Sequence, residues 1–308
     1  MKSTQHSTDV DTDPPHLHGA SVRPTVVPVR HYGRWALGAG VLIALALVVR
    51  AFAAADIQYG EVVAYFFNQS ILLGVVHTLE LTLMSMALAL VLGVTVAVMR
   101  QSDNPVLQWT GAGYTWLFRG TPLLVQLLLW FNLSLIFETF TIPGIYSVPM
   151  NQFMTPFIAA LLGLGVNEGA YIAEIVRGGI LSVDRGQREA AAAIGMTKAR
   201  TMRRIVLPQA MRVIVPPLGN EFIALLKYSS LAFAISYSEL LNSANKIYTA
   251  NFLVIELLFA ASLWYILLTT VFSVLQQMME LRLNRGIDGH RITMAARLRR
   301  NMSLRRAS

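Results

Sequence analysis

The segment REAAAAIGMTKARTMRRIVLP, residues 188–208, lies between two long apolar stretches of the chain. Its four consecutive alanines predict a helix, because alanine has the highest helix propensity. Gly195 can end that helix in the left-handed conformation, and Thr197 can cap a second short helix. We expect the second helix to end near Pro208, since the residue before a proline is disfavoured in the helical region. The sequence therefore predicts an elbow of two short helices, which is too charged to cross a membrane.

The composition around this elbow is that of a membrane protein. Of the 308 residues, 55% are hydrophobic and 14% are charged, and the mean hydropathy is +0.52. Soluble domains contain about 25% charged residues. The absence of cysteine excludes disulfides, thiolate metal sites and cysteine nucleophiles. The net charge of +8 does not indicate nucleic acid as a partner, because the basic residues flank apolar stretches.

Six apolar stretches are candidates for membrane-spanning helices, which need about 20 apolar residues each. They cover residues 35–55, 71–99, 108–136, 153–176, 213–237 and 253–279. The polar segment 1–34 before them is expected to be a mobile cytoplasmic tail. The first stretch could be mistaken for a signal peptide, but the long polar segment before it and Arg50 within it favour a retained additional helix. The predicted fold class is therefore an all-α polytopic membrane protein with about six transmembrane helices.

The distribution of basic residues predicts the orientation of these spans. Sixteen basic residues lie in the loop 177–212 and in the C-terminal tail 281–308. The opposite side contains a single basic residue, in the loops 56–70, 137–152 and 238–252. Because cytoplasmic loops are enriched in lysine and arginine, both termini and the elbow are expected to be cytoplasmic. An even number of spans agrees with two termini on the same side.

The elbow contains more than basic charge. A basic helix beside the membrane would be held by anionic lipid headgroups at about 1 kcal/mol per residue. Lipid does not explain the glutamate, the alanines or the glycine, whereas small side chains let a helix fit into the groove of another protein. The elbow also resembles the EAA loop of ABC importer permeases at seven positions, spacing included. These positions are Glu189, Ala190, Ala191, Gly195, Ile205, Leu207 and Pro208.

The resemblance extends over residues 71–280. The segments that are similar to the polar amino acid importers, of the histidine, arginine, glutamine and glutamate type, are RGTPLLVQL (119–127), NEGAYIAEIVRGGI (167–180), GQREAAAAIG (186–195) and LPQAMRVIVPPLGNEFIALLKYSSL (207–231). This resemblance implies an ABC importer type I transmembrane domain at 71–280, in which residues 182–208 form the coupling loop. The additional helix 35–55 and the basic cytoplasmic tail 281–308 lie outside it, and we expect them to contact membrane lipid.

The same resemblance implies a set of partners. The expected function is that of a membrane permease subunit, which translocates polar amino acids across the bacterial cytoplasmic membrane. A cytoplasmic ABC ATPase dimer would bind ATP and Mg, so no cofactor is expected in this chain. A second permease chain, identical or related, would complete the path. An extracytoplasmic amino acid-binding protein would deliver the substrate.

Ionisable and polar groups within the apolar stretches are candidates for the path, because charges at membrane depth are costly unless they are paired or functional. A carboxylate in a cavity would bind an ammonium or a cationic side chain, and a lysine or asparagine would meet the substrate's carboxylate. Proline and glycine in the third stretch predict a bent or broken helix, which either lines a cavity or only packs. The candidates for the substrate path are Arg119, Thr121, Glu168, Asn220, Glu221, Lys227, Ser229 and Ser230.

The other membrane-depth charges have structural explanations. Glu174 and Arg177 are three residues apart on one helix face and are expected to pair. Glu80 and Glu256 are expected at helix ends or at helix interfaces. These residues are therefore weaker candidates for contact with a substrate.

Enzyme signatures are absent from the sequence. It contains no GxxxxGK[ST], HExxH or GxSxG pattern and no Cys/His metal set, so we expect no catalytic residue and no metal site in this chain. Two alternatives to an ABC permease remain. An ion-coupled secondary amino acid transporter would use the membrane-depth glutamates as a relay, although no inverted repeat is visible. A membrane scaffold would use only the arginines of the elbow.

Overall fold

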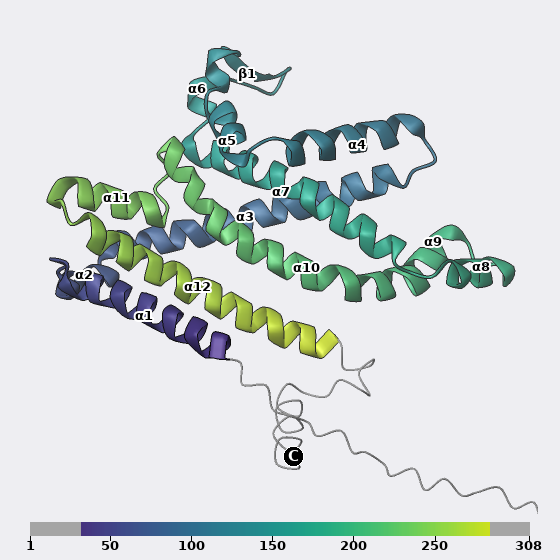
Figure 1. The fold of residues 1–308 in the computed structure, drawn as a ribbon. Coiled ribbons are helices and arrows are strands. Elements are labelled where there is room, and N and C mark those ends of the chain that lie inside the picture. Colours follow the sequence, from purple (N-terminus) through teal and green to yellow (C-terminus); the bar gives the residue numbers. More distant parts are fainter. Residues whose placement is uncertain (1–31, 284–308) are drawn as a thin grey trace, which may run out of the picture. The chain divides into compact units, whose positions relative to one another are not determined.

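The computed structural model describes residues 32–283 and is mostly helical, as predicted (Figure 1). The chain divides into two units, residues 1–56 and 57–308, which are described separately. The elements of the second unit up to the elbow are α2 (Tyr59–Phe66), α3 (Gln69–Arg100), α4 (Pro105–Gly120), α5 (Leu123–Phe131), η1 (Leu133–Leu135), β1 (Thr139–Ile142), β2 (Tyr146–Pro149), α6 (Met150–Phe153) and α7 (Pro156–Leu181). The remaining elements are α8 (Arg185–Ala193), α9 (Lys198–Thr201), η2 (Met202–Val206), α10 (Leu207–Tyr228), η3 (Ser229–Ile235), α11 (Leu240–Asn251) and α12 (Val254–Leu283).

The first unit contains the helix α1 (Tyr32–Ala54). Its segment Trp35–Ala54 is long and apolar enough to cross a membrane, and none of its most apolar window is buried within the protein. A helix that is apolar on all sides is expected to face lipid. The predicted tails 1–34 and 281–308 fall largely outside the described residues.

In the second unit, three helices meet the length and apolarity of a membrane span within the described residues: α3, α7 and α12. The other two predicted stretches of this unit are divided. The stretch 108–136 contains α4 and α5, which are separated by a break, and the stretch 213–237 contains most of α10 and the 3-10 helix η3. The two divided stretches are also those that contain most of the candidate path residues.

Glycines bring α3 and α7 into close contact along their length (Figure 1). A Cβ atom added to Gly93 of α3 would lie 2.5 Å from Ile172 and 3.0 Å from the carbonyl oxygen of Gly169. A Cβ atom added to Gly169 of α7 would lie 3.0 Å from Leu92. Small residues at such crossings let two backbones approach, which is the usual basis of helix association in membranes. The pair α3–α7 therefore forms a firm base for the side chains that α7 presents.

A short hairpin and α11 lie at the end of the second unit opposite α8 and α9 (Figure 1). The hairpin, β1 with β2, falls in the predicted loop 137–152 and pairs antiparallel from Thr139 opposite Pro149 to Ile142 opposite Tyr146. It is a small addition to the predicted all-α architecture. Glu256, in the first turn of α12, is buried and accepts a hydrogen bond of 3.0 Å from the backbone N–H of Gln58, so it is paired within the protein rather than exposed at the helix end.

Glu239 begins α11 and is fully buried. Its carboxylate accepts hydrogen bonds from the backbone N–H groups of Leu241 (2.8 Å) and Asn242 (2.7 Å) and from the hydroxyl of Tyr265 (2.8 Å). Burial raises the pKa of Glu239 to about 7, against the lowering effect of these three donors. The residue lies in the predicted loop 238–252, outside the membrane-spanning stretches.

Candidate functional site

The elbow has the local structure that its sequence predicts. Asp184 caps α8 by accepting a 2.7 Å hydrogen bond from the backbone two residues on. The turn after α8 contains Gly195 at φ +76°, in the left-handed region that favours glycine. Thr197 caps α9 by accepting a 3.4 Å hydrogen bond from the backbone three residues on. Two short helices joined at a glycine are thus confirmed.

The predicted end of the second helix near Pro208 is wrong. The helix continues from α9 through the π-helical turn η2 into α10. The backbone N–H of Leu207 bonds to the carbonyl of Met202, five residues back. Pro208 lies in the first turn of α10, and the widened turn before it accommodates a residue that has no N–H to donate. The elbow is therefore continuous with α10.

The predicted coupling positions present a surface of small residues. Glu189 and Ala190 are exposed, whereas Ala191 is buried and holds α8 against the rest of the elbow. Ile194, which follows α8, is 77% exposed. The other positions of the match are the exposed Gly195, Leu207 and Pro208 and the half-buried Ile205. Exposed alanines beside the exposed apolar side chains of Ile194 and Leu207 fit a groove of another protein better than they fit a lipid surface.

Arg188 connects the elbow to α7. Its Nη2 donates a hydrogen bond to the carbonyl of Ile180, in the last turn of α7. The last carbonyls of a helix have no partner within the helix, so this guanidinium supplies one. The Nε of Arg188 is buried and has no hydrogen-bond partner among residues 32–283.

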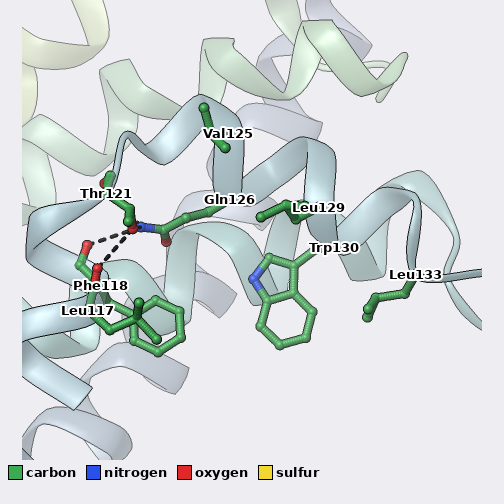
Figure 2. Close-up of a pocket in the computed structure, with 8 residues that line it drawn as sticks. All are labelled: Leu117, Phe118, Thr121, Val125, Gln126, Leu129, Trp130 and Leu133. Carbon is green, nitrogen blue, oxygen red and sulfur yellow. Dashed lines mark hydrogen bonds between the residues drawn. The ribbon is translucent and has the colours of Figure 1, made fainter. Parts of the chain in front are cut away.

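The helix break in the third apolar stretch is held by side-chain amides, of which Figure 2 shows that of Gln126. The break lies at Thr121 and Pro122, between α4 and α5. Gln126 folds back across it and donates to the hydroxyl of Thr121 at 2.7 Å and to the carbonyl of Phe118 at 3.0 Å. Asn167, from α7, donates to the same carbonyl at 2.7 Å. Carbonyls freed by the break are thus paired within the protein, as irregular backbone at membrane depth requires.

A cavity of about 450 Å³ opens beside this break. Glu168 of α7 and Glu221 of α10 both line it. Glu168 is 3% exposed, and its Oε1 accepts no hydrogen bond from the described part of the chain. Buried carboxylates require a partner, so the cavity is chemically suited to a cation. The remaining polar residues of the lining are Thr121, Asn167, Tyr171 and Tyr228.

Five predicted path residues, Arg119 among them, do not line this cavity. Asn220 accepts a 2.9 Å hydrogen bond from Gln276 of α12. The hydroxyls of Ser229 and Ser230 donate to carbonyls three residues back, at 2.7 and 2.6 Å, where α10 ends. Lys227 is exposed. The structure therefore brings together Thr121, Glu168 and Glu221 of the predicted set.

The last predicted path residue, Arg119, belongs to a cluster of charges around Glu174. The expected pair of Glu174 with Arg177 is present at 2.7 Å. Arg100, from the end of α3, forms a second ion pair with the same carboxylate. Arg119 lies 4.0 Å from it, and its guanidinium is 5.2 Å from the ring centre of Tyr171. One carboxylate thus faces three guanidinium groups.

Sequence reasoning did not identify Gln126, Tyr171 or Arg100 as site residues. Gln126 is a polar residue within the apolar run after RGTP, and Tyr171 follows Glu168 by three positions, so both have a weak signal in the sequence. Arg100 lies at the predicted cytoplasmic end of a predicted span, where a basic residue needs no further explanation. Among residues 32–283, no group of three or more His, Asp or Glu side chains is placed to hold a metal ion.

Comparisons with known proteins agree with this geometry. Residues 89–285 match the family described as binding-protein-dependent transport system inner membrane component. The chain is 41% identical to the arginine transport system permease protein ArgU of Corynebacterium glutamicum over 84% of this chain and 83% of that protein. It is 38% identical to the L-cystine transport system permease protein TcyB of Bacillus subtilis over 70% of this chain and 86% of that protein.

The fold is also similar to a solved transporter. The structure described as an amino acid ABC transporter with histidines has a TM-score of 0.65 and 34% identity, and the match covers 74% of this chain and 100% of that chain. A MetNI methionine ABC transporter in an inward-facing conformation has a TM-score of 0.58 at 20% identity, over 70% of this chain and 96% of that chain, which shows the fold alone.

Proposed function

The chain belongs to the family of binding-protein-dependent transport system inner membrane components, and we propose that it forms the path for a cationic amino acid. It is an integral membrane protein and the permease subunit of an amino acid ABC importer. The family and the relatives give no support to the ion-coupled alternative.

The observation that supports a cationic substrate is the pair Glu168 and Glu221 on one cavity wall. The unpartnered Oε1 of Glu168 is a strong acceptor that a guanidinium or ammonium group would satisfy. The relative whose name gives arginine as its substrate is 41% identical to this chain over the 262 aligned residues. The proposal of a cationic substrate rests on the carboxylates of the cavity, and the name of the relative agrees with it.

Two substrates of nearly equal shape test this proposal: arginine, with a charged guanidinium, and citrulline, with a neutral ureido group. We expect the full-length chain in lipid nanodiscs to bind arginine at least about tenfold more tightly, since a hydrogen bond to a charged group contributes about 1.5–3 kcal/mol. The variant Glu168→Gln should lose most of this preference, and Glu80→Gln, at an exposed position on α3, should keep it. Equal binding of arginine and citrulline by the unmodified chain would exclude the cationic assignment.

The elbow is proposed to dock into a cytoplasmic ATPase. Its small exposed residues and the projecting Ile194 support a protein partner. That partner would bind ATP and Mg, while this chain supplies the path and performs no hydrolysis. We further propose a second permease chain, an extracytoplasmic binding protein and a location in the bacterial inner membrane, with the elbow on the cytoplasmic side.

Co-purification with the ATPase tests the docking. The variant Gly195→Val places a β-branched residue at φ +76°, which is strongly disfavoured. The turn between α8 and α9 should therefore change its conformation, and with it the angle between the two helices. We expect the ATPase to be lost from the purified complex and ATP-driven uptake to stop. The control is Gly178→Ala in α7, where an added Cβ meets nothing within 4 Å. Retention of both ATPase and uptake in Gly195→Val would contradict the coupling role.

A further inference from the structure

A second cavity, which is shallow and open to the surface and has a volume of about 480 Å³, lies next to the one that contains Glu168. Arg100, Thr115, Trp116, Arg119 and Tyr171 line it. Tyr171 lines both cavities, so the two share a wall. The first cavity has two carboxylates in its lining, whereas the second has two guanidinium groups.

The guanidinium of Arg119 is not needed to neutralise Glu174. That carboxylate already forms closer ion pairs with Arg100 and Arg177, and Arg119 is the most distant of the three at 4.0 Å. The side chain of Arg119 is also 44% exposed, against 21% for Arg100. A half-exposed guanidinium held over Tyr171 and only weakly paired is available to a second anion.

We propose that Arg119, assisted by Arg100, binds the α-carboxylate of the transported amino acid in this second cavity. Guanidinium is the side-chain group best suited to a carboxylate, because its planar fork offers two parallel N–H donors. The inference rests on the proposed function in that the ligand is an amino acid. It does not depend on a cationic side chain, since the carboxylate is common to all α-amino acids.

The spacing along α7 makes the two cavities parts of one site. Glu168, Tyr171 and Glu174 follow one another at intervals of three residues, so their Cα atoms are about 4.5 Å apart along the helix axis at each step. The Cα atoms of Glu168 and Glu174 are therefore about 9 Å apart along the helix axis, which is less than two helical turns. An extended amino acid with a long side chain can place its cationic end at Glu168 and its carboxylate at Arg119.

The order of charges also fixes the direction in which such a ligand binds. The surplus guanidinium repels a cationic side chain from the second cavity, and the carboxylates of the first cavity repel the ligand's own carboxylate. Both effects select one orientation of the amino acid. Tyr171, between the two cavities, would contact the apolar part of the ligand.

Pairs of an amino acid and its carboxamide test this assignment, because the amide removes the negative charge with little change in shape. The probes are arginine with argininamide and glutamine with glutaminamide, and the measurement is equilibrium binding to the full-length chain in lipid nanodiscs. For the pair that binds, we expect the acid to bind at least roughly tenfold more tightly than the amide. In Arg119→Gln this ratio should fall to about 1–2, and Arg119→Lys should restore part of it, since lysine keeps the charge without the fork.

Arg177→Gln is the matched control. Arg177 is closer to Glu174 than Arg119 is, but it lines neither cavity, so this variant disturbs the charge cluster without removing the carboxylate site. It should keep the acid-to-amide ratio. The proposal is overturned if Arg177→Gln lowers the ratio as much as Arg119→Gln does, if Arg119→Gln leaves it unchanged, or if the unmodified chain does not prefer the acid.

The two proposals fail in different ways. Tighter binding of glutamine than of arginine would exclude the cationic substrate. The carboxylate site would still be tested, because the ratio of acid to amide affinity can then be measured with glutamine and glutaminamide. Loss of the acid-to-amide preference alone would exclude the carboxylate site and leave the cationic substrate in place.

Discussion

The elbow and the membrane-depth cavity differ in how far apart in the sequence their contacts lie. In the elbow, the caps at Asp184 and Thr197 and the turn at Gly195 all join residues within five positions of one another. In the cavity, Thr121, Glu168 and Glu221 meet although α4–α5, α7 and α10 are far apart in the chain. A pattern of residue types predicts local contacts well, whereas it gives no information on which distant segments pack together. The following substitutions test this difference, beginning with the largest expected effect.

Glu174→Gln should lower the stability of the folded chain more than the other substitutions do. It removes the negative charge that Arg100 and Arg177 share, and leaves two partly exposed guanidinium groups without a partner. Removing one partner of a fully buried pair costs about 3–5 kcal/mol, and the partial exposure of these side chains (21% and 33%) reduces that cost. We expect a clear fall in the thermal unfolding midpoint of the purified chain, whereas Glu80→Gln, an exposed position, should not change it. An unchanged midpoint would mean that the charge cluster is not part of the structural base of the cavity.

Gly169→Ala tests the packing of α3 against α7. The new Cβ would lie 2.7 Å from the hydroxyl of Tyr114 and 3.0 Å from Leu92, so side chains must move. Overpacking of this kind costs about 1–3 kcal/mol. The displaced Tyr114 would also lose its 2.6 Å hydrogen bond to the carbonyl of Val166. The same measurement on Gly113→Ala, where an added Cβ meets nothing within 4 Å, should show no comparable loss.

Asp184→Ala should act locally in the elbow. Loss of an N-cap side chain costs about 1 kcal/mol, and this cost falls on α8 because the contact is within the elbow. We expect faster amide hydrogen exchange in residues 185–193 with little change in the unfolding midpoint. Asp103→Ala serves as the control, since its 3.6 Å ion pair with Lys198 joins two side chains that are 98% exposed. Faster exchange throughout α7 and α10 would show that the elbow is not an independent local unit.

Glu239 should give a pH dependence of the stability rather than a fixed loss of stability. Its folded pKa of about 7 is above the ordinary value of 4.5, so the folded state holds the proton more tightly than the unfolded state does. The stability that protonation provides is therefore present at low pH and is lost as the pH rises through about 7. The unfolding midpoint should fall over this range, and Glu239→Gln should flatten the curve. A slope that persists in the variant would assign the titration to another group.

The predictions that succeeded share a physical reason. Helical stretches are visible because about 20 apolar residues have few alternatives in a bilayer, and the break at Thr121 and Pro122 is visible because proline lacks an N–H. The prediction at Pro208 failed because a π-helical turn relaxes the constraint that proline imposes, and no residue pattern indicated that turn. Gln126 was missed because its role depends on carbonyls that only the break exposes.

By itself, the sequence determined the membrane class, most of the helical segments and the two short helices of the elbow, together with the family to which the chain belongs. These follow from composition, from periodic apolar runs and from contacts between near neighbours. Only the tertiary structure decided that Glu168 and Glu221 share a cavity, that Asn220, Lys227, Ser229 and Ser230 lie outside it, and that Arg119 is a surplus cation beside Glu174. The reason is that each of these facts depends on which faces of distant helices are in contact. Gly93 and Gly169 allow α3 and α7 to approach closely, but the sequence does not show that these two helices are the ones that pack together.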